Sequence, residues 1–223
     1  LYKKLLGHES GEVVLDIGAN IGSHTLPLAQ LVVPKGGKVY AFEPTQYAFG
    51  KLIRNVALNP TIGKGVEVVQ AMLLAKDGVA AEQEIYSSWP LENTPNLHAD
   101  HRGQLKTTSG AQAFSLDSFV NVHDIKRIDF IKLDVDGHEP DVLAGSWLSL
   151  ERFHPTILME WSPHIFAERP EVMQHTLVRL LELGYGIFDG ETGMAITGGH
   201  EELDRRTPGK GSMNILLRFH DKA

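Results

Sequence analysis

The chain has 223 residues, 42% of them hydrophobic and 22% charged, and this balance excludes disordered, collagen-like and low-complexity proteins. It contains no cysteine, which excludes disulfides, thiolate nucleophiles and cysteine-ligated metal sites and is consistent with a cytoplasmic location. The 28 acidic and 21 basic residues give a formal net charge of −7, which argues against nucleic acid as a partner because phosphate binding requires a basic surface.

The length of the chain predicts one domain over residues 1–223, with a lead-in over 1–12 and loops over 90–103 and 189–212. No apolar run approaches the roughly 20 residues of a membrane span, and no signal peptide is recognisable. The chain begins at Leu1 without methionine, so we expect either a trimmed sequence or the tail of a longer protein. The sequence leaves open whether the chain forms a homo-oligomer.

Short apolar runs alternate with helical patterns, which predicts an α/β protein whose parallel strands are joined by helices. In chain order, we expect strands at 13–17, 38–42 and 66–74, helices at 23–33 and 45–58, and a hairpin formed by 82–87 and 104–114. We then expect strands at 128–135, 156–161, 185–188 and 214–219, and helices at 139–150 and 170–183. Thr45 is the expected N-cap of the second helix.

The first strand ends in an acid and a glycine-containing turn, Asp16-Ile17-Gly18-Ala19-Asn20-Ile21-Gly22. Ligands of an open parallel sheet bind beyond the carboxyl ends of its strands, and glycine lets the backbone approach them. The dinucleotide fingerprint G-x-G-x-x-G requires glycine at 18, 20 and 23, and only Gly18 matches. A nicotinamide-dependent oxidoreductase is therefore disfavoured, while a turn that serves only packing stays open.

Glu43 ends the second strand, 27 residues after Asp16. An acid at this place in a nucleotide-binding sheet accepts hydrogen bonds from ribose hydroxyls. The alternative is a stabilising interaction with the N-terminus of the following helix. The glycine turn beside it favours the ribose interpretation.

Lys132, Asp134 and Asp136 alternate along the end of another strand and therefore share one face. A lysine in a core strand is costly unless it is paired with carboxylates. The candidate partners are Asp16, Asp134 and Glu160. We expect no metal here, although a divalent ion held by Asp134, Asp136 and His138 stays an alternative. Glu139 is interpreted as an acid at the N-terminus of the next helix.

Several segments of the chain resemble FkbM-type methyltransferases. They are VVLDIGANIGSHTL (13–26), AFEP (41–44), SLDSF (115–119), IDFIKLDVDGHEPDVLAG (128–145) and ILMEW (157–161). The K-x-D-x-[DE]-G-x-E pattern in the fourth segment is the most specific. The resemblance implies an enzyme dependent on S-adenosylmethionine. It also implies a Rossmann-like, doubly wound, three-layer α/β/α fold, with a mostly parallel sheet of seven strands whose last strand is antiparallel.

The same resemblance implies positions for the methyl donor. It places Asp16, Gly18, Asn20 and Gly22 around the methionine and ribose parts, Glu43 on the ribose hydroxyls, and Asp134 beside the reacting methyl group. Gln70 is the candidate for adenine, because the end of the third strand lacks the aspartate that many enzymes of this fold use there. The chain departs from many family members by having Asp136 where they have glutamate.

Methyl transfer to a hydroxyl requires close alignment and a base that takes the proton. Asp134 and His138 are the candidate bases, and Lys132 is expected to orient Asp134. We expect O-methylation of a small-molecule or glycan hydroxyl, on a sugar, glycan or secondary metabolite, and the acceptor class follows from the resemblance alone. The loop 90–103 is the expected acceptor lid. A non-catalytic methyltransferase-like binding module is the alternative.

Overall fold

A computed structural model describes residues 1–87 and 104–220 of the chain. Its main sheet has eight strands in the order β11-β10-β12-β9-β8-β1-β2-β3. Their bounds are β1 Val13–Ile17, β2 Lys38–Phe42, β3 Val66–Val69, β8 Phe130–Leu133, β9 Thr156–Trp161, β10 Tyr185–Asp189, β11 Ala195–Ile196 and β12 Met213–Phe219. Strand β12 lies antiparallel between β9 and β10, and β3, β2, β1, β8 and β9 are parallel. The predicted mostly parallel sheet is confirmed, with the two-residue β11 added at one edge.

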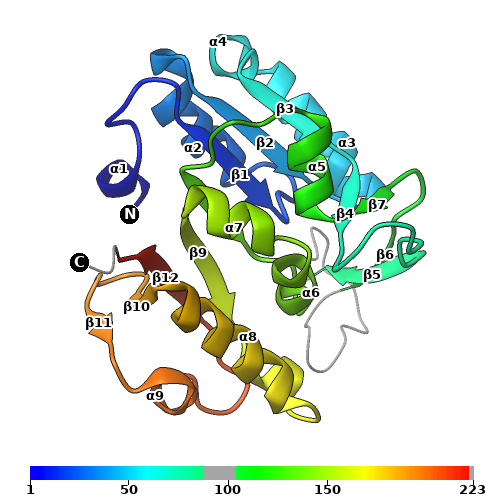
Figure 1. Ribbon diagram of the computed structural model, residues 1–223. Coiled ribbons are helices and arrows are strands. Elements are labelled where there is room, and N and C mark those ends of the chain that lie inside the picture. The colour runs from blue at the N-terminus through cyan, green and yellow to red at the C-terminus, as the bar shows by residue number, and fades with distance from the viewer. Residues whose placement is uncertain (88–103, 221–223) are drawn as a thin grey trace.

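Helices cover both faces of this sheet, as Figure 1 shows. The helices are α1 Tyr2–Leu5, α2 Thr25–Val32, α3 Gln46–Ala57, α4 Pro60–Gly63, α5 Leu116–Val122, α6 Glu139–Ala144, α7 Trp147–Phe153, α8 Pro170–Leu183 and α9 Gly199–Arg206, with 3₁₀ turns η1 Val33–Lys35 and η2 Pro163–Phe166. Because side chains alternate along a strand, Leu15 and Ile17 belong to the core cluster that includes residues of α5 to α8, while Val14 belongs to the cluster that includes residues of α2. The predicted three layers are therefore present.

The predicted third strand, 66–74, is wrong as a single element. Strand β3 ends at Val69, and β4 (Ala71–Leu73) leaves the main sheet to pair in parallel with β7 (Gln112–Phe114). Gln70 marks the break, because its side-chain Nε2 donates to the Ser109 carbonyl at 2.9 Å and its own carbonyl accepts from the Gln112 amide at 3.0 Å. Beyond this break, the chain pairs with β7 instead of continuing in the main sheet.

The predicted hairpin is shorter than expected. Strand β5 (Glu84–Ser87) pairs antiparallel with β6 (Gln104–Thr107), and the rest of the expected second strand belongs to β7. The tip, which contains the expected acceptor lid at 90–103, lies outside the described residues.

The predicted helix 139–150 is two helices, α6 and α7, which meet at Gly145 and Ser146. A Cβ on Gly145 would lie 2.1 Å from the carbonyl oxygen of Leu74, so only glycine allows this close approach. Asp117 of α5 caps α7, since its carboxylate accepts the backbone amides of Leu148 and Ser149 at 3.1 and 2.8 Å. Asp117 of the SLDSF segment therefore stabilises the start of α7. Helix α5, which begins in this segment, was not predicted.

Two predicted irregular segments contain regular structure. The expected loop 189–212 holds β11 and α9, and the expected lead-in 1–12 holds α1. Within residues 1–87 and 104–220, no helix has both the length and the apolar character of a membrane span.

Candidate functional site

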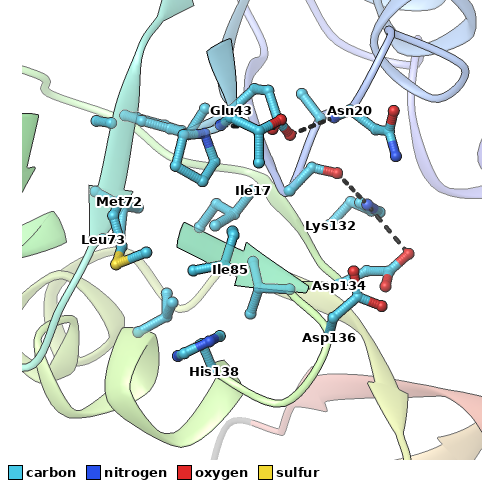
Figure 2. A pocket seen from close by; sticks show the side chains of 18 of the residues that line it. Ile17, Asn20, Glu43, Met72, Leu73, Ile85, Lys132, Asp134, Asp136 and His138 are labelled. Atoms are coloured by element: carbon cyan, nitrogen blue, oxygen red, sulfur yellow. Dashed lines mark hydrogen bonds and ion pairs between the residues drawn. The ribbon is translucent and has the colours of Figure 1, made fainter. Parts of the chain in front are cut away.

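A cleft of about 440 Å³ opens beyond the carboxyl ends of β1, β2 and β8. Figure 2 shows residues of its wall: Glu43 and Asn20 at the top of the view, Met72 and Leu73 at the left, Ile85 near the middle, Lys132, Asp134 and Asp136 at the right, and His138 at the bottom. A volume of this size is typical of pockets for small ligands and cofactors. The position is the one that a parallel sheet predicts.

Most of the predicted site residues meet in this cleft. Gly18, Asn20, Glu43, Lys132, Asp134, Asp136 and His138 line it, whereas Asp16, Gly22 and Gln70 do not. The side chain of Gln70 is directed to the Ser109 carbonyl instead, so its position gives no support to an adenine contact.

Glu43 joins the turn after β1 to the start of α3. Its Oε2 accepts the backbone N–H of Asn20 at 2.9 Å, and its Oε1 accepts the N–H of Thr45 at 2.9 Å and the Thr45 hydroxyl. Burial raises the pKa of Glu43, and these hydrogen bonds oppose that change by stabilising the carboxylate. Thr45 therefore precedes α3 as predicted, but its side chain binds Glu43 and makes no capping bond.

The two glycines of the turn have different neighbours. A Cβ on Gly18 would lie 1.8 Å from the Asp134 carbonyl oxygen, and one on Gly22 would lie 2.8 Å from Cδ1 of Leu52. Both residues have positive φ, and so does Asn20 between them, a conformation that asparagine tolerates. Gly18 therefore brings the turn against the end of β8, and Gly22 packs it on α3.

Lys132 is a buried cation at the centre of the site, with a side chain that is 5% exposed. Its Nζ lies 3.3 Å from Asp134 Oδ2 and 3.7 Å from Asp16 Oδ1, and it donates to the Gly18 carbonyl at 2.9 Å. Burial disfavours the ammonium form, but Asp16 and Asp134 outweigh burial and raise the pKa of Lys132. Asp16 also accepts the Thr25 hydroxyl at 2.6 Å. The predicted pairing of Lys132 with these two acids is confirmed.

Glu139 holds the turn that carries Asp134 and Asp136. Its carboxylate accepts the backbone N–H of Val135 at 3.0 Å and of Gly137 at 3.1 Å, and the residue is buried. Asp136 has φ of +53°, a left-handed conformation that needs such support. Burial raises the pKa of Glu139 to about 7. Glu139 is the first residue of α6, so its interpretation as a helix N-terminal acid is confirmed, but its hydrogen bonds to the turn were not predicted because burial is not visible in local sequence.

This pKa predicts a pH dependence of stability. In the unfolded chain the Glu139 carboxyl ionises near 4.5, whereas in the folded chain it keeps its proton until about pH 7. Between these values the unfolded state binds fewer protons, so the contribution of Glu139 to stability is full below 4.5 and is lost as the pH rises through 7. We expect the melting temperature of the wild type to fall more between pH 5 and 8 than that of Glu139→Gln. An equal fall in both proteins would contradict this, and Glu151→Gln, on the exposed side of α7, is the control.

Among the further residues that line the cleft, His24 and Glu160 are titratable groups with shifted pKa values that sequence reasoning did not assign to it. His24 lies with its Nδ1 2.7 Å from the Tyr2 hydroxyl, and burial and then Lys132 lower its pKa. Glu160 is the second-last residue of β9, and burial and then Asp134 raise its pKa. Glu160 follows an apolar run, the same signal that selected Asp16 and Glu43. His24 does not follow such an apolar run, so nothing in the sequence placed it in the cleft.

The residues that the structure describes do not support the alternative of a bound divalent metal ion. No group of three histidine or acidic side chains there is arranged to hold an ion, and this includes Asp134, Asp136 and His138.

Comparison with protein families matches residues 16–187 to the methyltransferase FkbM domain, which is most of the chain. The chain belongs to the FkbM methyltransferase family. The resemblance noted in the sequence is therefore confirmed, and the methyl donor of this FkbM domain is S-adenosylmethionine. Family membership also argues against a nicotinamide-dependent oxidoreductase.

Individual relatives of the FkbM domain share little sequence identity with it. Hexuronic acid methyltransferase AglP of Haloferax volcanii is 25% identical over 143 residues, which cover 64% of this chain and 53% of the relative. The crystal structure of methyltransferase FkbM from Methylobacillus flagellatus has a TM-score of 0.56 at 16% identity, covering 96% of this chain and 45% of that one. A putative rRNA methylase from Clostridium thermocellum has the same TM-score at 12% identity, covering 99% and 92%. The two structures show the shared fold alone, and this chain spans about half the length of the first two relatives.

Proposed function

We propose that this FkbM domain transfers the methyl group of S-adenosylmethionine to a hydroxyl of a sugar, glycan or similar hydroxylated metabolite. The observation that carries the proposal is the cleft itself, in which a buried carboxylate, Glu43, and an acid-rich end at Asp134, Asp136 and Glu160 share one cavity with an apolar wall. The name of the Haloferax relative supports a sugar as the acceptor.

The residues of the cleft suit the donor. Met72, Leu73 and Ile85 offer an apolar wall to the purine, and Glu43 presents a carboxylate to the ribose hydroxyls. Asp136 and Glu160, which line the acid-rich end of the cleft, suit the positive charges of the sulfonium and amino groups. Asp16 acts indirectly in this proposal: it lies below the wall and, with Thr25, holds Lys132 in place.

When bound, S-adenosylmethionine supplies an electrophilic methyl group on a positively charged sulfur. The side chains of the chain then have two tasks. The walls align the acceptor hydroxyl and exclude water. Asp134 or His138 takes the proton of that hydroxyl, and Lys132, 3.3 Å from Asp134, orients the carboxylate.

Thermal-shift titration tests the donor half of the proposal. S-Adenosylmethionine or its demethylated product, at 100 times the dissociation constant, is expected to add roughly 2.7 kcal/mol of stability, whereas NAD is expected to add none. Absence of stabilisation by both sulfur compounds would overturn the proposal. Transfer of a labelled methyl group to a panel of hexoses, hexuronic acids and their glycosides tests the acceptor half.

Removing the charge of Glu43 is expected to weaken donor binding. Glu43→Gln should raise the dissociation constant of S-adenosylmethionine about 10- to 100-fold, because hydrogen bonds to a charged group contribute roughly 1.5–3 kcal/mol. Isothermal titration calorimetry measures this. Glu67→Gln is the matched control, since Glu67 lies on β3 and pairs with Lys38 away from the cleft, and it should bind like the wild type. Unchanged affinity in Glu43→Gln would remove Glu43 from the donor site.

A further inference from the structure

A second pocket, of about 320 Å³, is lined by Asp189, Glu191, Arg206, Ser212, Met213 and Asn214. We call it the polar pocket. Its residues come from the end of β10, from α9 and from the start of β12, and the proposed function uses none of them. Its volume is within the range of ligand sites.

The polar pocket adjoins the donor cleft through Glu160. Asn214 of β12 is directly opposite Glu160 of β9, and opposed residues of antiparallel strands project from the same face. The Ser212 side chain is also near enough to Glu160 to oppose the rise that burial and Asp134 cause in the pKa of Glu160. Since Glu160 lines the donor cleft while Ser212 and Asn214 line the polar pocket, the two hollows are neighbours along one edge of the sheet.

The chemistry of the polar pocket matches hydroxyl groups. Its wall presents carboxylate, amide, hydroxyl and guanidinium groups, which together donate and accept hydrogen bonds. The charge of Arg206 is already balanced, because its guanidinium lies 2.5 Å from Glu202 and 3.5 Å from Asp189. The pocket therefore has no surplus positive charge that would select an anion.

We propose that the polar pocket binds a neutral, hydroxyl-rich sugar unit that is linked to the unit being methylated. This inference rests on the proposed function and specifies its acceptor as an oligosaccharide or glycoside that extends from Asp134, past Glu160, to Asn214. A monosaccharide acceptor contacts only the cleft, whereas the second unit of a disaccharide also contacts the polar pocket.

The test compares acceptors of two lengths. Methyl transfer is measured to free hexoses and hexuronic acids, and to the disaccharides in which each is linked β1,4 to glucose. In the wild type, we expect kcat/KM for the best disaccharide to exceed that of its monosaccharide at least tenfold, mainly through a lower KM. In Asn214→Ala/Glu191→Ala, whose two altered side chains are exposed, the advantage should fall below threefold.

The control is Asn121→Ala on the exposed side of α5, which should keep the full disaccharide advantage. Equal kcat/KM for both lengths in the wild type, or an undiminished advantage in the double variant, would overturn the inference and leave the proposed function standing. Transfer to no sugar of either length would also overturn the inference, and the proposed function would fall with it only if S-adenosylmethionine and its demethylated product also failed to stabilise the protein.

Discussion

Replacing Asp134 by asparagine is expected to lower kcat for methyl transfer about 10²- to 10⁴-fold, which is the usual contribution of a positioned proton acceptor. The amide has the size of the carboxylate but cannot take a proton. Asp134 lines the cleft beside Lys132, so its loss should affect the chemical step more than donor binding. Single-turnover transfer from labelled S-adenosylmethionine measures the rate, and calorimetry checks that donor affinity is retained.

His138→Gln is the matched comparison, because His138 is the other candidate base that lines the cleft. A loss in Asp134→Asn with little change in His138→Gln assigns the proton to Asp134, and the reverse result assigns it to His138. Wild-type turnover in Asp134→Asn with normal donor binding would show that Asp134 is not the base.

Replacing Lys132 by methionine is expected to lower the free energy of unfolding by about 3–5 kcal/mol, the usual cost of removing one partner from a buried ion pair. Asp16 is 0% exposed and its Oδ1 has no hydrogen-bond donor among the described residues, so Lys132 is the charge that compensates it. Urea denaturation at pH 7 measures the loss. The double variant Lys132→Met/Asp16→Asn should recover part of it, since the uncompensated charge is then gone.

Lys126→Met is the control for that experiment. Lys126 pairs with Asp124 at the surface, where its side chain is 68% exposed, and such a pair contributes about 0–1 kcal/mol. A loss in Lys132→Met no larger than the loss in Lys126→Met would mean that Asp16 is stabilised by other groups.

Much of the fold could be predicted from local sequence patterns. Strands β1, β2 and β9 and helix α8 have the predicted bounds, because each is a periodic apolar segment ended by a polar residue, glycine or proline. The same reasoning located Glu43 and Asp134, since parallel strands bring their carboxyl ends to one edge. The pairing of Lys132 followed from the cost of burying a charge.

Other elements depend on contacts between distant segments. The break at Gln70 requires the Ser109 and Gln112 backbone, 39 and 42 residues away, and the break at Gly145 requires the backbone of Leu74. Helix α9 has a very polar sequence with a single buried residue, Leu203, so it lacks the apolar stripe by which a helix is recognised in a sequence. Local propensity cannot register such contacts.

For the site, the sequence alone established the family motif, the acidic residues at the ends of the strands, and the need of the buried Lys132 for carboxylate partners. The folded chain established the rest: that Glu43 binds the Asn20 amide, that Glu139 is buried under the turn it holds, and that Glu160 lies between the cleft and the polar pocket. The division has one physical reason. Strand ends and charges are properties of short segments, whereas burial and the meeting of two walls exist only once distant segments have packed together.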